Sequence, residues 1–156
     1  MANDLLVKLY ELPPLQPEFE KMQKAGVIIR RPIGPENYKV IAWITEHFGE
    51  GWAGESENAF FNNPKSIFIA IKDEKMVGFA CYDATVKGFF GPTGVQEDCR
   101  GLGIGKALLI YTLHGLKDAG YGYGVIGSPG PVEFYVKALG AMEIPCSAPG
   151  VYKGML

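Results

Sequence analysis

Three glycines alternate along one short segment, Arg100-Gly101-Leu102-Gly103-Ile104-Gly105, which leads into an expected helix over residues 105–119. The first N–H groups of a helix have no intrahelical partner and lie at the positive end of the helix dipole. Glycines lack side chains and let a bulky anion approach those groups closely. A plain turn before a helix needs only one or two glycines. The spacing therefore predicts a pyrophosphate-binding turn, with Arg100 and Lys106 adding positive charge at its ends.

Two common phosphate motifs do not fit this segment. A P-loop, GxxxxGK[ST], requires glycine at position 100 and a hydroxyl residue after the lysine, whereas the chain has Arg100 and Ala107. A dinucleotide motif, GxGxxG, starting at Gly101 requires glycine at position 106, which is a lysine. The pattern that does fit is [RQ]xxGx[GA], with Arg100, Gly103 and Gly105 at its fixed positions.

The apolar periodicity predicts a mixed α/β layer fold built from one domain. The strand before the glycine-rich turn, residues 87–95, is interrupted by glycines and by Pro92, which indicates an edge or a bulge. Residues 50–54 are expected to form a glycine-broken loop, and residues 1–26 are hard to interpret beyond a short helix that ends near Gly26. The remaining expected elements are strands at 27–29, 66–71, 76–82 and 121–126, helices at 36–48, 56–61 and 131–139, and one or two short strands at the C-terminus.

Two landmarks in this order resemble the GCN5-related N-acetyltransferases (GNAT family). The pattern Arg100-x-x-Gly103-x-Gly105 lies between an irregular strand and a long helix, as the pyrophosphate motif of that family does. Downstream, Glu133-Phe134-Tyr135-Val136-Lys137-Ala138-Leu139-Gly140 is similar to the family's Phe-Tyr-x-Lys-x-x-Gly segment. The resemblance covers the chain from Val27 to its C-terminus.

The resemblance implies a mixed, mostly antiparallel central sheet with a splayed strand and with helices on both faces. It also implies that residues 1–156 form a single acyl-CoA N-acyltransferase domain, in which residues 1–26 are an N-terminal extension. Acetyl-CoA is the implied cosubstrate, and its pantetheine arm is expected at the backbone of Thr93 and Val95 on the splayed strand. The pyrophosphate is expected at residues 100–106, Leu102 and Ile104 included. Family members often pair through their C-terminal strands, so a homodimer is expected.

The resemblance assigns Tyr135 as the acid that protonates the departing thiolate. A phenol with a pKa near ~10 stays protonated at neutral pH and can donate to a thiolate whose thiol has a pKa near ~8.5. The attacking amine must lose a proton, but residues 87–95 contain no carboxylate to accept it. Asp83, Glu50 and Glu133 acting through water are the alternatives, and the base stays unassigned.

Two aromatic residues are candidates for contact with the acceptor. Trp52 lies in the glycine-broken segment where a substrate lid is expected, and Tyr82 ends an expected strand. Either could instead be part of the core. The acceptor is expected to be a small-molecule amine or a peptide amine. A non-catalytic acyl-CoA-binding or sensor module on the same scaffold is the alternative, because the strand carboxylate is missing.

Composition and charge narrow the classes of partner that the chain is expected to bind. The formal net charge of -2 and the absence of a basic stripe argue against nucleic-acid binding. Cys81, Cys99 and Cys146 lack metal-ligand spacing, so no metal is expected. No signal peptide and no apolar run of the ~18 residues needed to span a bilayer is present, so no membrane association is expected. A cytoplasmic protein with free thiols is expected.

Overall fold

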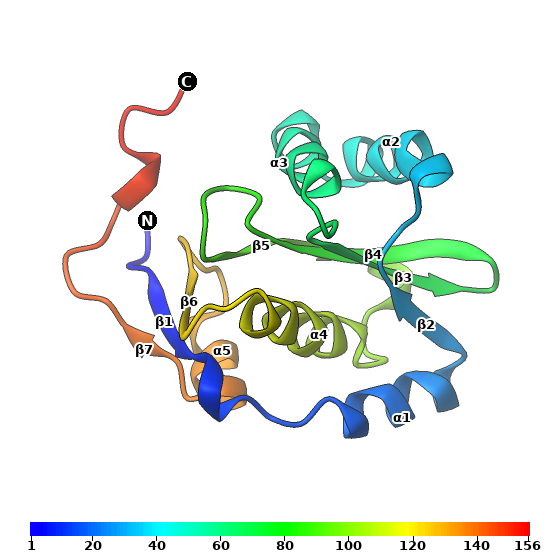
Figure 1. Cartoon of the computed structure of the whole chain (residues 1–156), viewed down its shortest axis with the longest axis horizontal. Helices are drawn as coiled ribbons and strands as arrows, with labels where there is room; N and C mark the ends of the chain where they lie inside the picture. The colour runs from blue at the N-terminus through cyan, green and yellow to red at the C-terminus, as the bar shows by residue number, and fades with distance from the viewer.

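The computed structural model describes residues 1–156, and its centre is a sheet of seven strands in the order β2-β3-β4-β5-β6-β1-β7 (Figure 1). Neighbouring strands are antiparallel except for β5 and β6, which are parallel. The predicted mixed, mostly antiparallel sheet is therefore confirmed. The strands are β1 (Leu5–Lys8), β2 (Val27–Arg30), β3 (Ile67–Lys72), β4 (Lys75–Tyr82), β5 (Phe89–Val95), β6 (Tyr123–Ile126) and β7 (Met142–Glu143).

Helices cover both faces of the sheet, as predicted (Figure 1). Helices α2 and α3 lie over one face, whereas α4 lies against the other face with α1 and α5 beside it. The bounds are α1 (Gln16–Ala25), α2 (Asn37–Phe48), α3 (Glu50–Phe61), α4 (Ile104–Asp118) and α5 (Val132–Leu139). Short 3-10 turns occupy Leu9–Glu11, Gly34–Glu36, Glu97–Cys99 and Gly150–Tyr152.

Two apolar clusters fix these helices on the sheet. The larger cluster packs α4 against the strands, and Leu108, Leu113 and Leu116 are completely buried in it. The smaller cluster joins α2 and α3 to β3 and β4 through Ile44, Ala59 and other buried residues. Burial of a leucine side chain contributes roughly 1.5–3 kcal/mol, so α4 is firmly anchored. The turn that begins α4 is therefore held in a defined position beside β5.

The splayed strand is β5. It pairs with β6 only through Phe89 and Phe90, and the β4–β5 register shifts next to Gly91 and Pro92. Beyond Phe90, β5 continues along β4 but has no strand partner on its other side. The glycine and proline interruptions in the sequence had indicated this irregularity, and proline cannot donate a ladder hydrogen bond. The gap beside β5 opens directly above the N-terminus of α4.

The N-terminal residues differ from expectation. Residues 1–26, expected to be an extension, supply α1 and also β1, which lies between β6 and β7. Leu5 and Val7 are completely buried, and Leu5 pairs with Ile126. A strand of four residues has little sequence signal of its own, because its stability comes from partners more than a hundred residues away.

The predicted loop at residues 50–54 is wrong. Helix α3 begins at Glu50, directly after Gly49, whose φ of +95° ends α2. Gly51 and Gly54 are accommodated because glycine in a helix costs only about 1 kcal/mol, which tertiary packing offsets here. Trp52 and Glu55 consequently lie three residues apart on one helix, on neighbouring turns.

The length and apolar character of the helices decide whether one of them could cross a membrane. None of them joins sufficient length with sufficient apolar character to traverse a bilayer.

Candidate functional site

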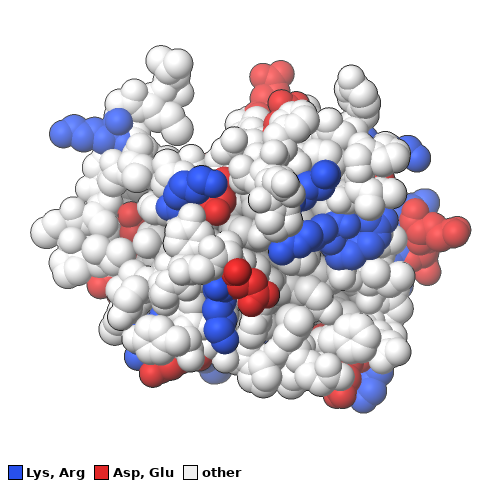
Figure 2. Space-filling view, in the orientation of Figure 1, with Lys and Arg blue, Asp and Glu red and all other residues white.

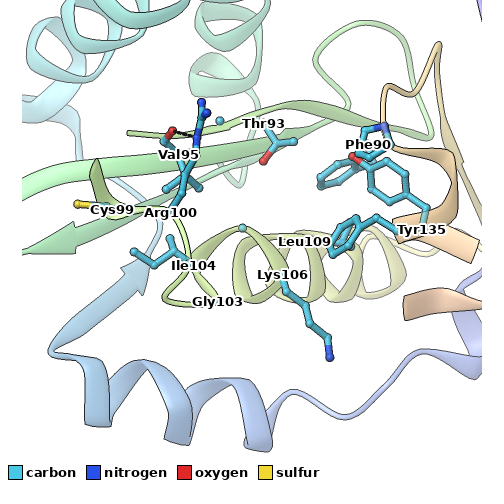
Figure 3. Close-up of a pocket in the computed structure, with 15 residues that line it drawn as sticks. Phe90, Thr93, Val95, Cys99, Arg100, Gly103, Ile104, Lys106, Leu109 and Tyr135 are labelled. Atoms are coloured by element: carbon cyan, nitrogen blue, oxygen red, sulfur yellow. Dashed lines mark hydrogen bonds between the residues drawn. The ribbon is translucent and has the colours of Figure 1, made fainter. Parts of the chain in front are cut away.

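A cavity of about 460 Å³ lies between β5 and the start of α4, and the side of α5 closes one end of it (Figure 3). It brings together most of the residues that the sequence had singled out. Thr93 and Val95 come from β5, the glycine-rich turn leads into α4, and Tyr135 comes from α5. The lining residues of the turn are Arg100, Gly101, Gly103, Ile104, Gly105 and Lys106, whereas Leu102 is exposed and does not line the cavity.

The turn presents a row of free backbone donors. The N–H groups from Gly101 to Lys106 donate no hydrogen bond within the protein, and the first to do so is that of Ala107, to Gly103 O at 3.0 Å. Gly101 and Gly103 have φ values of +89° and +83°, a region that favours glycine. Ile104 is almost fully buried and anchors the turn in the core. The arrangement is a fixed anion cradle at a helix N-terminus.

The two cations beside the cradle differ in orientation. Arg100 Nε donates to Val95 O at 3.3 Å, and the other guanidinium nitrogens have no protein partner. Lys106 Nζ lies 3.6 Å from the buried carboxylate of Glu18 on α1, and its side chain points away from β5 (Figure 3). Arg100 is therefore free to meet an anion, whereas the Lys106 side chain is already paired and joins α4 to α1.

The splayed strand turns polar backbone groups toward the gap. Gln96 N donates to Val77 O at 2.7 Å, so the alternation of an antiparallel ladder assigns the next hydrogen-bonded pair to Gly94 and Phe79. The N–H groups of Thr93 and Val95 then point away from β4, to the side where β5 has no strand partner. These groups border the cavity and can hydrogen-bond an extended ligand.

Tyr135 lies at the end of the cavity, against Phe90 (Figure 3). The residue is only 7% exposed, and its hydroxyl makes no hydrogen bond within the protein. Burial raises the pKa of Tyr135, so the phenol carries its proton at neutral pH. Cys99 at the other end has a raised pKa, first through burial and then through the Asp98 carboxylate. The cavity therefore contains an available proton donor and no reactive thiolate.

The two aromatic candidates for acceptor contact separate in the structure. Trp52 is 38% exposed and lines a second cavity of about 570 Å³, where α3 faces the Gly91–Pro92 bulge of β5. Tyr82 is 3% exposed and lines neither cavity; its hydroxyl accepts a hydrogen bond from Arg31 Nη1 at 3.0 Å. The structure thus places Trp52 in the lining of the second cavity. Tyr82 is instead a core residue packed on Gly115.

None of the carboxylates considered as a base from the sequence lines either cavity. Asp83 is buried, and it accepts hydrogen bonds from Gly88 N at 2.7 Å and from the Tyr121 hydroxyl at 3.2 Å. Glu50 and Glu133 are exposed on the first turns of α3 and α5. The carboxylate that does line the second cavity is Glu55. Sequence reasoning missed it because the helix that carries it was expected to start at Ser56.

Gly94 is the position where β5 touches the helices above it. A Cβ atom on Gly94 would lie 2.4 Å from the Phe48 ring, which stacks on Trp52 with 5.1 Å between ring centroids. We predict that Gly94→Ala displaces this aromatic pair and lowers the free energy of unfolding by about 1–3 kcal/mol, the usual cost of overpacking. Chemical denaturation measures this. Gly122→Ala is the control, because no atom lies within 4 Å of an added Cβ there and its backbone is outside the left-handed region; an equal loss in both variants would show that the Phe48 contact is not the cause.

Comparison with known proteins agrees with this geometry. Residues 36–140 match the model of the Acetyltransferase (GNAT) family, a segment that includes β5, the cradle and Tyr135. No curated protein matches the chain.

Solved structures share the fold. One is the GCN5-related glucosamine N-acetyltransferase region of a fungal multi-domain GH3 beta-N-acetylglucosaminidase, with a TM-score of 0.74 and 14% identity over 92% of this chain and 20% of that one. A GCN5-related N-acetyltransferase from Sphaerobacter thermophilus has a TM-score of 0.67 and 19% identity over 91% of this chain and 48% of that one. Another from Kribbella flavida has a TM-score of 0.58 and 15% identity over 91% and 54%. The chain thus spans only part of the length of the structures it matches.

Proposed function

The chain belongs to the acetyltransferase (GNAT) family, and from that premise we propose that it transfers the acetyl group of acetyl-CoA to a primary amine by direct attack of the amine. One observation supports the proposal more strongly than the others do. The free N–H groups from Gly101 to Lys106 and Tyr135, whose hydroxyl has no hydrogen-bond partner in the protein, border the same cavity. An anion cradle and an acid at opposite ends of one cavity suit a long, anionic thioester.

The residues of the cavity fit the parts of coenzyme A. The cradle supplies several converging N–H donors for the pyrophosphate, and the guanidinium of Arg100 adds positive charge. The outward-facing N–H groups of Thr93 and Val95 suit the amides of the pantetheine arm, since an extended chain beside a strand hydrogen-bonds as a further strand does. In the view of Figure 2, basic and acidic side chains are interspersed over the surface of the molecule. The largest cluster of basic side chains in that view lies in the right half, where Figure 1 shows β3 and β4.

Tyr135 supplies the proton that the reaction needs. As the neutral amine nitrogen bonds to the carbonyl carbon, the C–S bond breaks, the sulfur leaves as a thiolate, and the nitrogen releases one proton to water. The raised pKa of Tyr135 keeps the phenol protonated for transfer to that sulfur. Direct attack requires no covalent enzyme intermediate, which agrees with the absence of a reactive thiolate in the cavity.

Thiol release from acetyl-CoA, measured across a panel of amines, tests the proposal. Glucosamine belongs in that panel, because one structural relative is described as a glucosamine N-acetyltransferase region. We expect amine-dependent release of free coenzyme A together with an N-acetylated product in the mass spectrum. Tight coenzyme A binding without turnover of any amine would instead favour a sensor module. The absence of a carboxylate on β5 is the observation that gives this alternative weight.

A further inference from the structure

The second cavity, which we call the acceptor cavity, is built by segments far apart in the sequence. Trp52 and Glu55 come from α3, Gly91 and Pro92 from the β5 bulge, and Tyr152 from the C-terminal turn. Phe90 lines this cavity and also the cavity that holds Tyr135. The two cavities therefore share Phe90 in their walls, at the point where β5 leaves β6.

Glu55 is the only charged side chain that lines the acceptor cavity. Its Oε1 accepts a hydrogen bond from Thr85 Oγ1 at 2.6 Å, and this bond fixes the carboxylate in place. Its other oxygen has no hydrogen-bond partner in the protein, and no protein cation lies within ion-pair distance. A partly buried carboxylate with a free oxygen is a binding site for a cationic donor.

The remaining lining has no basic side chain. No lysine, arginine or histidine side chain lines the acceptor cavity, whereas Thr85, Ser128 and Tyr152 supply hydroxyl groups. Burial raises the pKa of Tyr152, and the nearby carboxylates of Glu55 and Asp4 raise it further. The Glu55 carboxylate, with no basic side chain beside it in the lining, repels a carboxylate on a ligand. The 38% exposed ring of Trp52 offers a flat apolar surface beside this charge.

The wall that carries Tyr152 is held by the N-terminal residues. Asp4 Oδ1 accepts a hydrogen bond from Ser128 N at 3.0 Å, and Asp4 N donates to Ser147 Oγ at 2.8 Å. Asn3 Oδ1 accepts from the N–H groups of Ser147 and Ala148. Because β1 lies inside the sheet, these contacts fix the C-terminal segment to the end of β6. The acceptor cavity is therefore a structured site rather than a gap beside a loose tail.

We propose that the acceptor cavity selects a primary amine with an apolar ring and no carboxylate, and that Glu55 binds its ammonium group before acetylation. The inference rests on the proposed function, because it names the acceptor class of the same reaction. Glu55 holds the cationic nitrogen by a charge-assisted hydrogen bond until that nitrogen loses one proton to water and can attack, and Trp52 packs on the ring. An amino acid is disfavoured, since its carboxylate would face Glu55 with no basic side chain to pair with it.

Phenylethylamine and phenylalanine test this directly, since they differ only by one carboxylate. Binding of each is measured by calorimetry to the full chain saturated with coenzyme A. We expect phenylethylamine to bind about 10-fold or more tightly than phenylalanine. Glu55→Gln should lose that preference and weaken phenylethylamine binding by about 10-fold. Glu57→Gln, an exposed carboxylate on the same helix that does not line the cavity, is the matched control and should behave as the unaltered chain.

Three results would overturn the proposal: phenylalanine binding as well as phenylethylamine, Glu55→Gln binding phenylethylamine unchanged, or neither compound binding the unaltered chain. The prior titration with coenzyme A separates this from the proposed function. If coenzyme A itself does not bind, the proposed function fails. If coenzyme A binds normally and the amine results are negative, only the assignment of the acceptor class fails.

Discussion

Gly103→Glu is expected to abolish coenzyme A binding. Gly103 caps α4 at a φ of +83°, so the new side chain would strain the turn and place a carboxylate beside the free N–H groups. That carboxylate would compete for the donors and repel the pyrophosphate. Loss of two charge-assisted hydrogen bonds, each about 1.5–3 kcal/mol, weakens affinity by at least about 100-fold. Isothermal titration calorimetry with coenzyme A measures the effect.

Gly120→Glu separates binding from backbone strain. Gly120 follows the other end of α4, has a φ of +104°, and has no atom within 4 Å of an added Cβ. The same substitution therefore imposes similar strain on the same helix at a distance from the cradle. We expect Gly120→Glu to keep the affinity for coenzyme A even where its stability falls. If Gly103→Glu binds coenzyme A as tightly as Gly120→Glu does, the cradle is not the pyrophosphate site.

Tyr135→Phe is expected to lower kcat by about 100-fold while leaving the affinity for coenzyme A unchanged. The substitution removes only the hydroxyl, and general acid catalysis contributes about 100-fold or more. The aromatic contact with Phe90 is kept, so the end of the cavity keeps its shape. Single-turnover measurements with any accepted amine give the rate of the chemical step. Tyr123→Phe, an exposed tyrosine on β6, is the matched control and should leave kcat unchanged.

The pH profile adds a second measure of the same assignment. Burial raises the pKa of Tyr135 above its ordinary value near ~10, so its proton is present below that pH and is lost only at higher pH. We expect kcat to show no fall from loss of this proton until the pH exceeds about 10. An unchanged kcat in Tyr135→Phe would show that another group, or water, protonates the thiolate.

The sequence was most informative where the signal is local. The alternating glycines around Gly103 and the interruptions at Gly91 and Pro92 follow from backbone geometry, and the expected fold with its splayed strand is confirmed. Features that depend on partners far away in the sequence differ from what the sequence predicts. The strand Leu5–Lys8 is stabilised by β6 and β7, and the Lys106 side chain was expected to face the anion but pairs with Glu18 on α1.

The acceptor side shows how one wrong boundary hides a residue. Treating residues 50–54 as a loop separated Trp52 from Glu55, although both line one cavity once α3 begins at Glu50. Tyr82 is the reverse case, because the sequence made it a candidate for acceptor contact and the structure places it in the core. An aromatic residue at the end of a strand suits either a site or the core, and its contact with Gly115 on α4 decides for the core. Contacts between distant elements settle such cases, and a single sequence does not display them.

We propose that the free N–H groups of the turn and of β5 bind coenzyme A. An amide NMR titration of the isotope-labelled protein with coenzyme A tests it without altering any residue. We expect the amide signals of Gly101, Gly103, Gly105, Thr93 and Val95 to shift on saturation, whereas that of Gly120 at the far end of α4 should not. Saturable binding that leaves the signals of those five residues unmoved would contradict it.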